Sequence, residues 1–116
     1  MADIAVWDIP RVLRAGDTYD GFALALADEN GAIPLEGAAV RMQWRAFRKR
    51  GALALDLQLG AGIEVSDALG GEIFVGPITV PAAPGRYFYD IEFTFADGTV
   101  RTWLEGTADV GEQVTQ

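Results

Sequence analysis

The side chains of this sequence that could do chemistry are almost all carboxylates. The chain has 17 Asp and Glu residues but no His and no Cys, and it has a single serine, Ser66, and a single lysine, Lys49. Imidazole bases, thiol nucleophiles, disulfides and zinc sites of the usual Cys/His kind are therefore excluded. Ser–His and Schiff-base chemistry are effectively closed as well. A pair of carboxylates is the remaining catalytic option.

Asp90, Glu92 and Glu105 could be read as such a pair. Glycoside cleavage uses two carboxylates on either side of the bond that breaks. The alternation of the surrounding residues, however, places all three on the outer face of a hairpin, and nothing in the pattern indicates a cleft that excludes water. We therefore predict that the protein is not an enzyme and has no catalytic residues.

The segment Asp28-Glu29-Asn30-Gly31 resembles the start of a calcium-binding loop. It lacks the further acidic ligands and the distant Glu that such a loop requires. The Asn30-Gly31 pair tolerates positive φ and is typical of a tight turn. We expect a solvated hairpin turn here, with no bound metal and no cofactor.

Charge is distributed very unevenly along the chain. The formal net charge is −8, yet five of the nine basic residues lie between positions 41 and 50, which leaves −13 on the rest. Net negative charge disfavours nucleic acid as a partner, because phosphate binding needs a positive surface. A dipolar protein of this kind suits complementary contacts between subunits.

The five basic residues are expected to have two roles. Alternation places Arg41 and Arg45 on the outer face of their strand, where they should neutralise nearby carboxylates. The members of this intramolecular charge ladder would be Arg41, Arg45, Asp90, Glu92 and Glu105. The other three residues, Arg48, Lys49 and Arg50, form the tip of a hairpin. They are either a solvated turn or a docking point for an acidic surface, such as another copy of this protein.

The elements that must position these residues are short strands. Gly and Pro recur every 8–12 residues, and hydrophobicity alternates between them, which is typical of antiparallel sheet. We expect strands at 12–19 (broken by Gly16), 21–27, 39–47, 53–59, 63–65 and 72–80, and a hairpin over 86–110. Residues 1–10 are either an edge strand or an arm ended by Pro10.

The hairpin over 86–110 carries the most information. Asp97-Gly98 is a strong signal for a two-residue loop. That loop predicts the inward pairs Tyr89–Gly106, Ile91–Leu104, Phe93–Thr102 and Phe95–Val100, and the outward pairs Phe88–Thr107, Asp90–Glu105, Glu92–Trp103 and Thr94–Arg101. Phe88 and Trp103 then share the outer face. They could anchor an interface, stack on a sugar ring, or be covered by another segment.

These patterns predict one all-β domain over residues 1–116, with 1–10 and 111–116 as candidate arms. Strands with one apolar face each imply two packed sheets, so we expect an immunoglobulin-like antiparallel β-sandwich, with a small β-barrel as the alternative. No apolar run approaches the roughly 20 residues of a membrane-spanning helix. The acidic N-terminus does not resemble an export signal, so we expect synthesis in the cytoplasm. We expect no membrane association.

Several short motifs resemble a pattern found in small phage and prophage proteins. These motifs are Gly16-Asp17-Thr18, Asn30-Gly31, Gly37-Ala38-Ala39-Val40, Gly85-Arg86-Tyr87-Phe88-Tyr89-Asp90-Ile91, Asp97-Gly98-Thr99-Val100, Gly106 and Val114-Thr115. The chain is similar in these positions to tail- and baseplate-associated proteins, including the N-terminal domain of the baseplate upper protein family. The longer members of that family continue into further domains, whereas this chain ends at Gln116.

The resemblance implies a structural component of a bacteriophage virion, in the tail/baseplate or head–tail region, that acts through protein–protein contacts. Its partners would be other virion proteins or copies of itself, and it would reside in the virion after synthesis in the host cytoplasm. The hypothetical interface residues are Arg48, Lys49, Arg50, Phe88 and Trp103. Two alternatives remain open: a capsid decoration protein, and a carbohydrate-binding module that uses the exposed aromatics.

Overall fold

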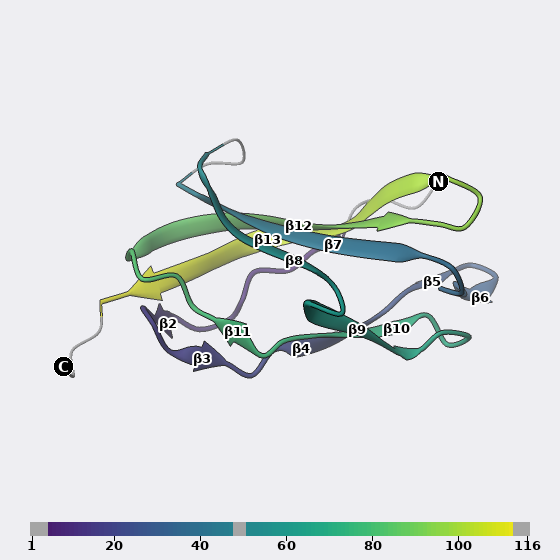
Figure 1. Cartoon of the computed structure of the whole chain (residues 1–116), viewed down its shortest axis with the longest axis horizontal. Coiled ribbons are helices and arrows are strands. Elements are labelled where there is room, and N and C mark those ends of the chain that lie inside the picture. The colour runs from purple at the N-terminus through teal and green to yellow at the C-terminus, as the bar shows by residue number, and fades with distance from the viewer. Residues whose placement is uncertain (1–4, 48–50, 113–116) are drawn as a thin grey trace.

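The computed structural model describes residues 5–47 and 51–112, in which all regular structure is β-strand (Figure 1). The strands are β1 (Ala5–Val6), β2 (Leu13–Arg14), β3 (Thr18–Tyr19), β4 (Phe22–Ala25), β5 (Ala27–Asp28), β6 (Gly31–Ala32), β7 (Ala39–Ala46), β8 (Leu53–Leu59), β9 (Gly62–Asp67), β10 (Glu72–Val75), β11 (Ile78–Thr79), β12 (Gly85–Thr94) and β13 (Val100–Gly111). In the part of the chain that the structure describes, no helix is long and apolar enough to span a bilayer.

The strands form two layers. One layer contains β13, β12, β7 and β8, and the other contains β9, β10 and β4 together with the small β11–β3 sheet (Figure 1). A single curled sheet runs through both layers in the order β1-β13-β12-β7-β8-β9-β10-β4. It turns the corner between β8 and β9, which pair in parallel only at Gln58–Gly62 and Leu59–Ile63. This architecture confirms the predicted all-β sandwich, although one curled sheet forms both layers and β13 pairs in parallel with β1 and β2.

The core lies between the layers because the long strands are apolar on one face. Burial alternates along β7 and β12 with a period of two residues, as a half-buried strand requires. Met42, Trp44, Ile91 and Phe93 are fully buried at the centre. Tyr89 lies beside them, with its ring 6.2 Å from that of Trp44. Residues that follow each of these in sequence point to the outer face instead.

The predicted register of the β12–β13 hairpin is correct from Phe88 to Ile91 and wrong between Ile91 and the connecting loop. The pairs Phe88–Thr107, Tyr89–Gly106, Asp90–Glu105 and Ile91–Leu104 are present, but a shift after Ile91 then pairs Glu92 with Thr102, Phe93 with Arg101 and Thr94 with Val100. The loop is one residue longer than predicted, since Phe95 donates to the carbonyl of Thr99 and Gly98 has φ +88°. A three-residue loop that ends in a left-handed glycine gives this pattern. A β-bulge at Trp103 absorbs the difference.

Two strand predictions also need correction. The strand predicted at 53–59 does not keep its leucines on one face, because a register shift beyond Trp44 pairs Leu53 with Arg45. Leu53 therefore lies on the same face as Arg45 and is 47% exposed. The strand predicted at 72–80 is two strands, β10 and β11, separated by Pro77, which has no N–H to donate to a ladder.

The N-terminal segment is the edge strand rather than the free arm. β1 pairs in parallel with β13, and the amides of Trp7 and Ile9 donate to the carbonyls of Glu105 and Thr107, each at 2.9 Å. The Trp7 ring packs on Phe22 of the other layer at 4.9 Å. This contact closes one side of the sandwich. Of the arm predicted at 111–116, Gly111 ends β13, Glu112 follows it, and the rest lies outside the described residues.

Candidate functional site

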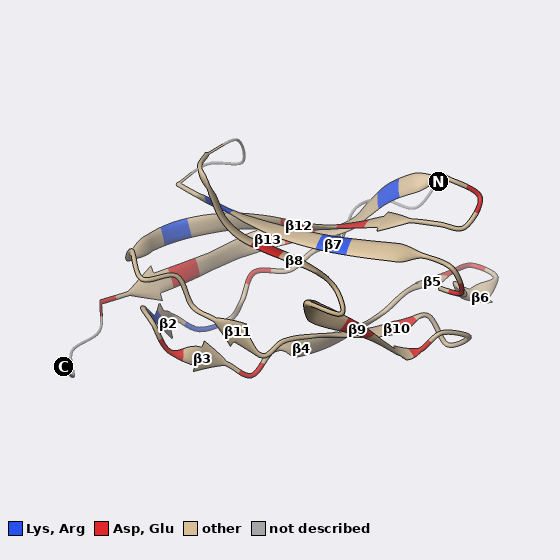
Figure 2. Ribbon diagram, in the orientation of Figure 1, with Lys and Arg blue, Asp and Glu red and all other residues tan. Residues whose placement is uncertain are grey.

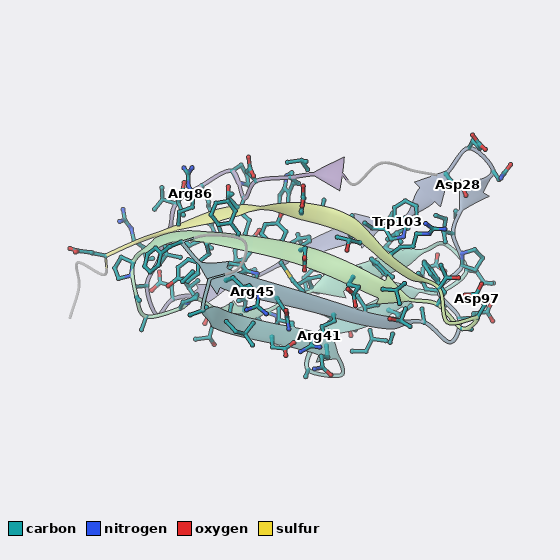
Figure 3. The ribbon with its side chains drawn as sticks, turned by 90° about the horizontal axis from the view of Figure 1, so that it is seen from above. Asp28, Arg41, Arg45, Arg86, Asp97 and Trp103 are labelled. Carbon is teal, nitrogen blue, oxygen red and sulfur yellow. The ribbon has the colours of Figure 1, made fainter. Side chains whose placement is uncertain are left out.

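Most of the predicted site residues lie on the outer face of the first layer. Strands β1, β13, β12, β7 and β8 run side by side across this face, seen from above in Figure 3. Arg45 lies opposite Phe88 and Arg41 opposite Glu92, because β7 and β12 are neighbouring strands. Both acidic and basic positions lie on these strands (Figure 2).

The strand arginines do not pair with the carboxylates predicted for them. Arg41 forms a two-point ion pair with Asp56 of β8, with Nε–Oδ1 at 3.0 Å and Nη2–Oδ2 at 2.6 Å. The hydrogen bond from Arg41 lowers the pKa of Asp56 and raises that of the arginine. Glu92 is only an electrostatic neighbour of Arg41. The sequence places Asp56 on an outer face by alternation, but not on the strand beside β7.

Arg45 is likewise directed away from the predicted ladder. Its guanidinium donates to the carbonyl of Gly51 and to Oε1 of Gln43, each at 3.1 Å. A second ion pair, Arg86–Asp109 at 2.9 Å, joins directly opposed residues of β12 and β13. Extending the predicted hairpin register by two more pairs would have identified it.

Asp90 and Glu105 are directly opposed across β12 and β13, as predicted. Asp90 is exposed, but partial loss of hydration raises the pKa of its carboxylate, and repulsion from Glu92 and Glu105 raises it further against an opposing effect of Arg45. The Asp90 side chain forms no hydrogen bond or ion pair with the side chains or backbone of the described residues. The local surface is therefore strongly negative.

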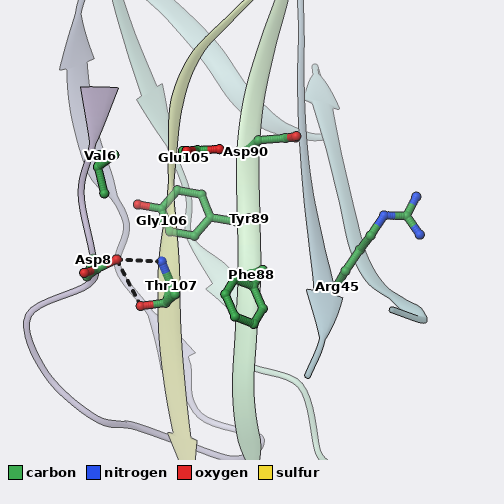
Figure 4. A pocket seen from close by; sticks show the side chains of 9 residues that line it. All are labelled: Val6, Asp8, Arg45, Phe88, Tyr89, Asp90, Glu105, Gly106 and Thr107. Atoms are coloured by element: carbon green, nitrogen blue, oxygen red, sulfur yellow. Dashed lines mark hydrogen bonds between the residues drawn. The ribbon is translucent and has the colours of Figure 1, made fainter. Parts of the chain in front are cut away.

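A pocket of about 190 Å³ opens beside these two carboxylates. Its walls are Val6, Asp8, Arg45, Phe88, Tyr89, Asp90, Glu105, Gly106 and Thr107. Asp8 is held in place by the amide and the hydroxyl of Thr107, which both donate to Oδ1 at 3.0 Å (Figure 4). The pocket thus combines the ring of Phe88 and three carboxylates with one arginine, Arg45.

The two predicted interface aromatics have different surroundings. Phe88 is half-buried on the outer face and lines the pocket. The prediction that Trp103 shares this face is wrong, because the bulge changes its orientation and its partly buried ring packs against the core. Reasoning from the sequence also missed Val6 and Phe47, both 68% exposed.

The remaining candidates are the basic segment 48–50 and the segment 28–31. Arg48, Lys49 and Arg50 lie outside the described residues. The segment 28–31 forms the predicted turn between β5 and β6, in which Asp28 Oδ1 accepts the amide of Asn30 at 2.8 Å. Over residues 5–47 and 51–112, no three His, Cys, Asp or Glu side chains are grouped in a way that could hold a metal ion.

A comparison of the sequence with protein-family models finds no matching family, and a comparison with curated proteins finds no match either. The resemblance to phage tail and baseplate proteins therefore stays a prediction.

Proposed function

We propose that this chain is a non-catalytic structural domain that acts through protein–protein contacts, as a component of a bacteriophage virion. The observation that carries the proposal is the open edge of β8. This edge is apolar and exposed, and among the described residues only two positions of β8 pair with β9.

The backbone of β8 has pairing capacity on its open side. The amide and carbonyl of Gln58 bond to Ala61, so this residue is not hydrogen-bonded to β7. Antiparallel ladders alternate between bonded and non-bonded pairs. The N–H and C=O of Asp56, two positions away, must therefore also point away from β7. No described strand pairs with them.

The side chains of β8 do not protect this edge. Natural proteins block exposed edges with Lys, Pro or inward-pointing charges, because an open edge recruits other strands. Between Leu53 and Leu59 there is no Lys or Pro, and the single charge, Asp56, is neutralised by Arg41. Leu53, which is 47% exposed, adds apolar surface. A surface of this kind favours coverage by a protein partner.

The test is incorporation into particles. Leu53→Lys places a charge at the open edge, and we expect it to reduce incorporation into phage particles at least tenfold while the melting temperature stays nearly constant. Leu69→Lys is the matched control, since Leu69 is 69% exposed in the turn between β9 and β10. Equal incorporation of both variants, or absence of the wild-type chain from purified particles, would contradict the proposal.

The alternatives are distinguished in the same preparation. A capsid decoration protein would fractionate with heads rather than tails. A carbohydrate-binding module is supported by Phe88 beside Asp90 and Glu105, although the packing of Trp103 against the core removes one of its two aromatics. Binding on a glycan array without incorporation into particles would favour that module.

A further inference from the structure

The strand β8 borders the first layer on the side opposite β1 (Figure 3). The N–H and C=O of Asp56 point away from β7, and no strand among the described residues pairs with them. Gln58 uses its own amide and carbonyl on Ala61, at 3.1 and 2.8 Å. Asp56 is therefore the last residue that can offer backbone groups at this edge before the corner to β9. Such an edge can pair with a strand from another molecule.

The sequence of β8 is symmetric about Asp56. Read in either direction, the strand 53–59 has a leucine at each end and a leucine on each side of the aspartate, and only Ala54 and Gln58 break the symmetry. Two copies that run antiparallel with Asp56 opposite Asp56 place Leu55 of one opposite Leu57 of the other. A two-fold contact needs a surface that is complementary to itself, because the same patch occurs on both sides. The symmetry of β8 therefore favours a second copy over an unrelated strand.

The orientation of the backbone selects the same register. Opposed residues of an antiparallel ladder alternate between pairs that exchange both backbone hydrogen bonds and pairs that exchange none. Since the N–H and C=O of Asp56 point to the open side, two copies of Asp56 form a bonded pair. Leu55 and Leu57 then form the non-bonded pairs, in which the two residues approach most closely. Both leucines are half-buried and pack against the core of their own copy, so the contact extends one core toward the other.

The charge at this edge does not prevent two copies from meeting. Each copy has a net charge of −8, which opposes contact over most of the surface. Asp56 is the single charged residue of β8, and Arg41 of the same copy pairs with it at 2.6 Å. Hydrogen bonds from Arg41, Gln58 and Gln43 lower the pKa of Asp56. A two-fold axis at this residue therefore brings together two ion pairs rather than two uncompensated carboxylates.

We propose that two copies of this chain join antiparallel through their β8 edges, about a two-fold axis at Asp56. The inference rests on the proposed function, because it names the partner that covers the β8 edge. The central pair supplies the backbone hydrogen bonds, and the leucines on either side of it supply the apolar contact.

The first experiment compares Asp56→Pro with Asp56→Ala by sedimentation velocity of the full chain. Both substitutions remove the carboxylate and its ion pair, but only the first removes the N–H. That N–H points to the open side, so its loss breaks no hydrogen bond to β7, and proline is tolerated at such an edge. The two melting temperatures should therefore be similar.

We expect the wild-type chain to dimerise as its concentration rises. Asp56→Ala should dimerise at least as tightly, because the opposed carboxylates are gone. Asp56→Pro should dimerise about tenfold more weakly or worse, because the two-fold axis removes both central N–H donors at once. Equal dimerisation of the two variants, or a wild-type chain that stays monomeric at every concentration, would overturn the inference.

The second experiment does not depend on how well proline is tolerated. The chain has no cysteine, so single-cysteine variants give unambiguous cross-links. Opposed non-bonded residues lie close enough for a disulfide, whereas residues displaced by two positions do not. Under mild oxidation, a mixture of Leu55→Cys and Leu57→Cys should form the mixed dimer, and each variant alone should form little.

The matched control is a mixture of Leu55→Cys with Leu69→Cys, since Leu69 is 69% exposed in the turn between β9 and β10. This mixture should cross-link no faster than Leu55→Cys alone. Equal yields from the control mixture and from the mixture of positions 55 and 57 would contradict the register and overturn the inference.

The outcomes also separate this inference from the proposed function. If Leu53→Lys abolishes particle incorporation but the wild-type chain does not dimerise, the β8 edge binds another virion protein and only the self-pairing is wrong. If the copies pair at Asp56 but the chain is absent from particles, the self-pairing stands and the virion role is wrong.

Discussion

Tyr89→Phe should loosen the N-terminal segment without disturbing the core. The Tyr89 ring is only 4% exposed and stacks on Trp44, and its hydroxyl donates to the carbonyl of Trp7. Burial raises the pKa of Tyr89, so the phenol stays protonated and able to donate throughout the ordinary pH range. Phenylalanine keeps the ring and removes only the hydrogen bond.

The expected cost follows from that single bond. Its loss contributes about 1 kcal/mol, and leaving the Trp7 carbonyl without a partner increases the total to roughly 1–3 kcal/mol. For a domain of this size, that lowers the melting temperature by about 4–12 °C. Tyr89→Ala, which also empties the core, should cost roughly 3–5 kcal/mol.

Calorimetry and hydrogen exchange together test the reasoning. In Tyr89→Phe, the amides of Trp7 and Ile9 should exchange faster, because their hydrogen bonds to the carbonyls of Glu105 and Thr107 form only while this segment stays beside β13. The exchange rates of the amides in the β7–β12 ladder should change only through the lower global stability and not through local opening. An unchanged melting temperature together with unchanged exchange at Trp7 would refute the role given to the hydroxyl.

Three further predictions concern the core and the outer face. Phe93→Ala should cost roughly 3–5 kcal/mol in urea denaturation and half-buried Trp103→Ala roughly 2 kcal/mol, whereas Phe88→Ala should leave stability nearly intact; equal costs for all three would mean that the outer face is covered. The hydrogen bond from Arg41 lowers the folded pKa of Asp56, so the ionised carboxylate stabilises the fold above the unfolded pKa of about 3.8 and this stabilisation is lost as the pH falls below it. Asp56→Asn should remove this pH-dependent stabilisation. Identical melting curves of variant and wild type from pH 2 to 7 would contradict this. Asp90 has a raised folded pKa, so its ionisation destabilises the fold as pH rises through that value; Asp90→Asn should therefore raise the melting temperature at pH 7 and lose this advantage below about pH 3.8, and a constant advantage at all pH values would count against the assignment.

How far the sequence predicts this fold depends on where local patterns determine register. Strict alternation around Tyr89 and Ile91 leaves one register that buries both, so the lower half of the hairpin is predictable pair by pair. The loop at Asp97-Gly98 is compatible with two lengths, which differ by one residue. Only the bulge at Trp103 makes the longer loop consistent with the core, and a bulge has no binary pattern of its own.

The candidate site was less predictable than the fold because ion pairs depend on which strands become neighbours. Alternation alone assigns Arg41 and Asp56 to outer faces, but many strand orders satisfy it. The order β12-β7-β8 places Arg41 between Glu92 and Asp56, and the shorter contact is with Asp56. The pocket was not predictable, since it also needs Asp8 from a segment about 100 positions away.

The pairing of β1 and β2 with β13 has a consequence for synthesis of the chain. Among the described residues, β1 and β2 pair only with the last long strand, with Ala5 beside Leu104 and Leu13 beside Val110. During translation, the N-terminal segment therefore leaves the ribosome first but can pair with β13 only when that strand has been synthesised. Until β13 emerges, Trp7 and Ile9 have no partner strand, and one edge of β12 is open to other nascent chains. Pairing between segments so far apart in the sequence is slow, so the incompletely folded chain is prone to aggregation before the fold is complete.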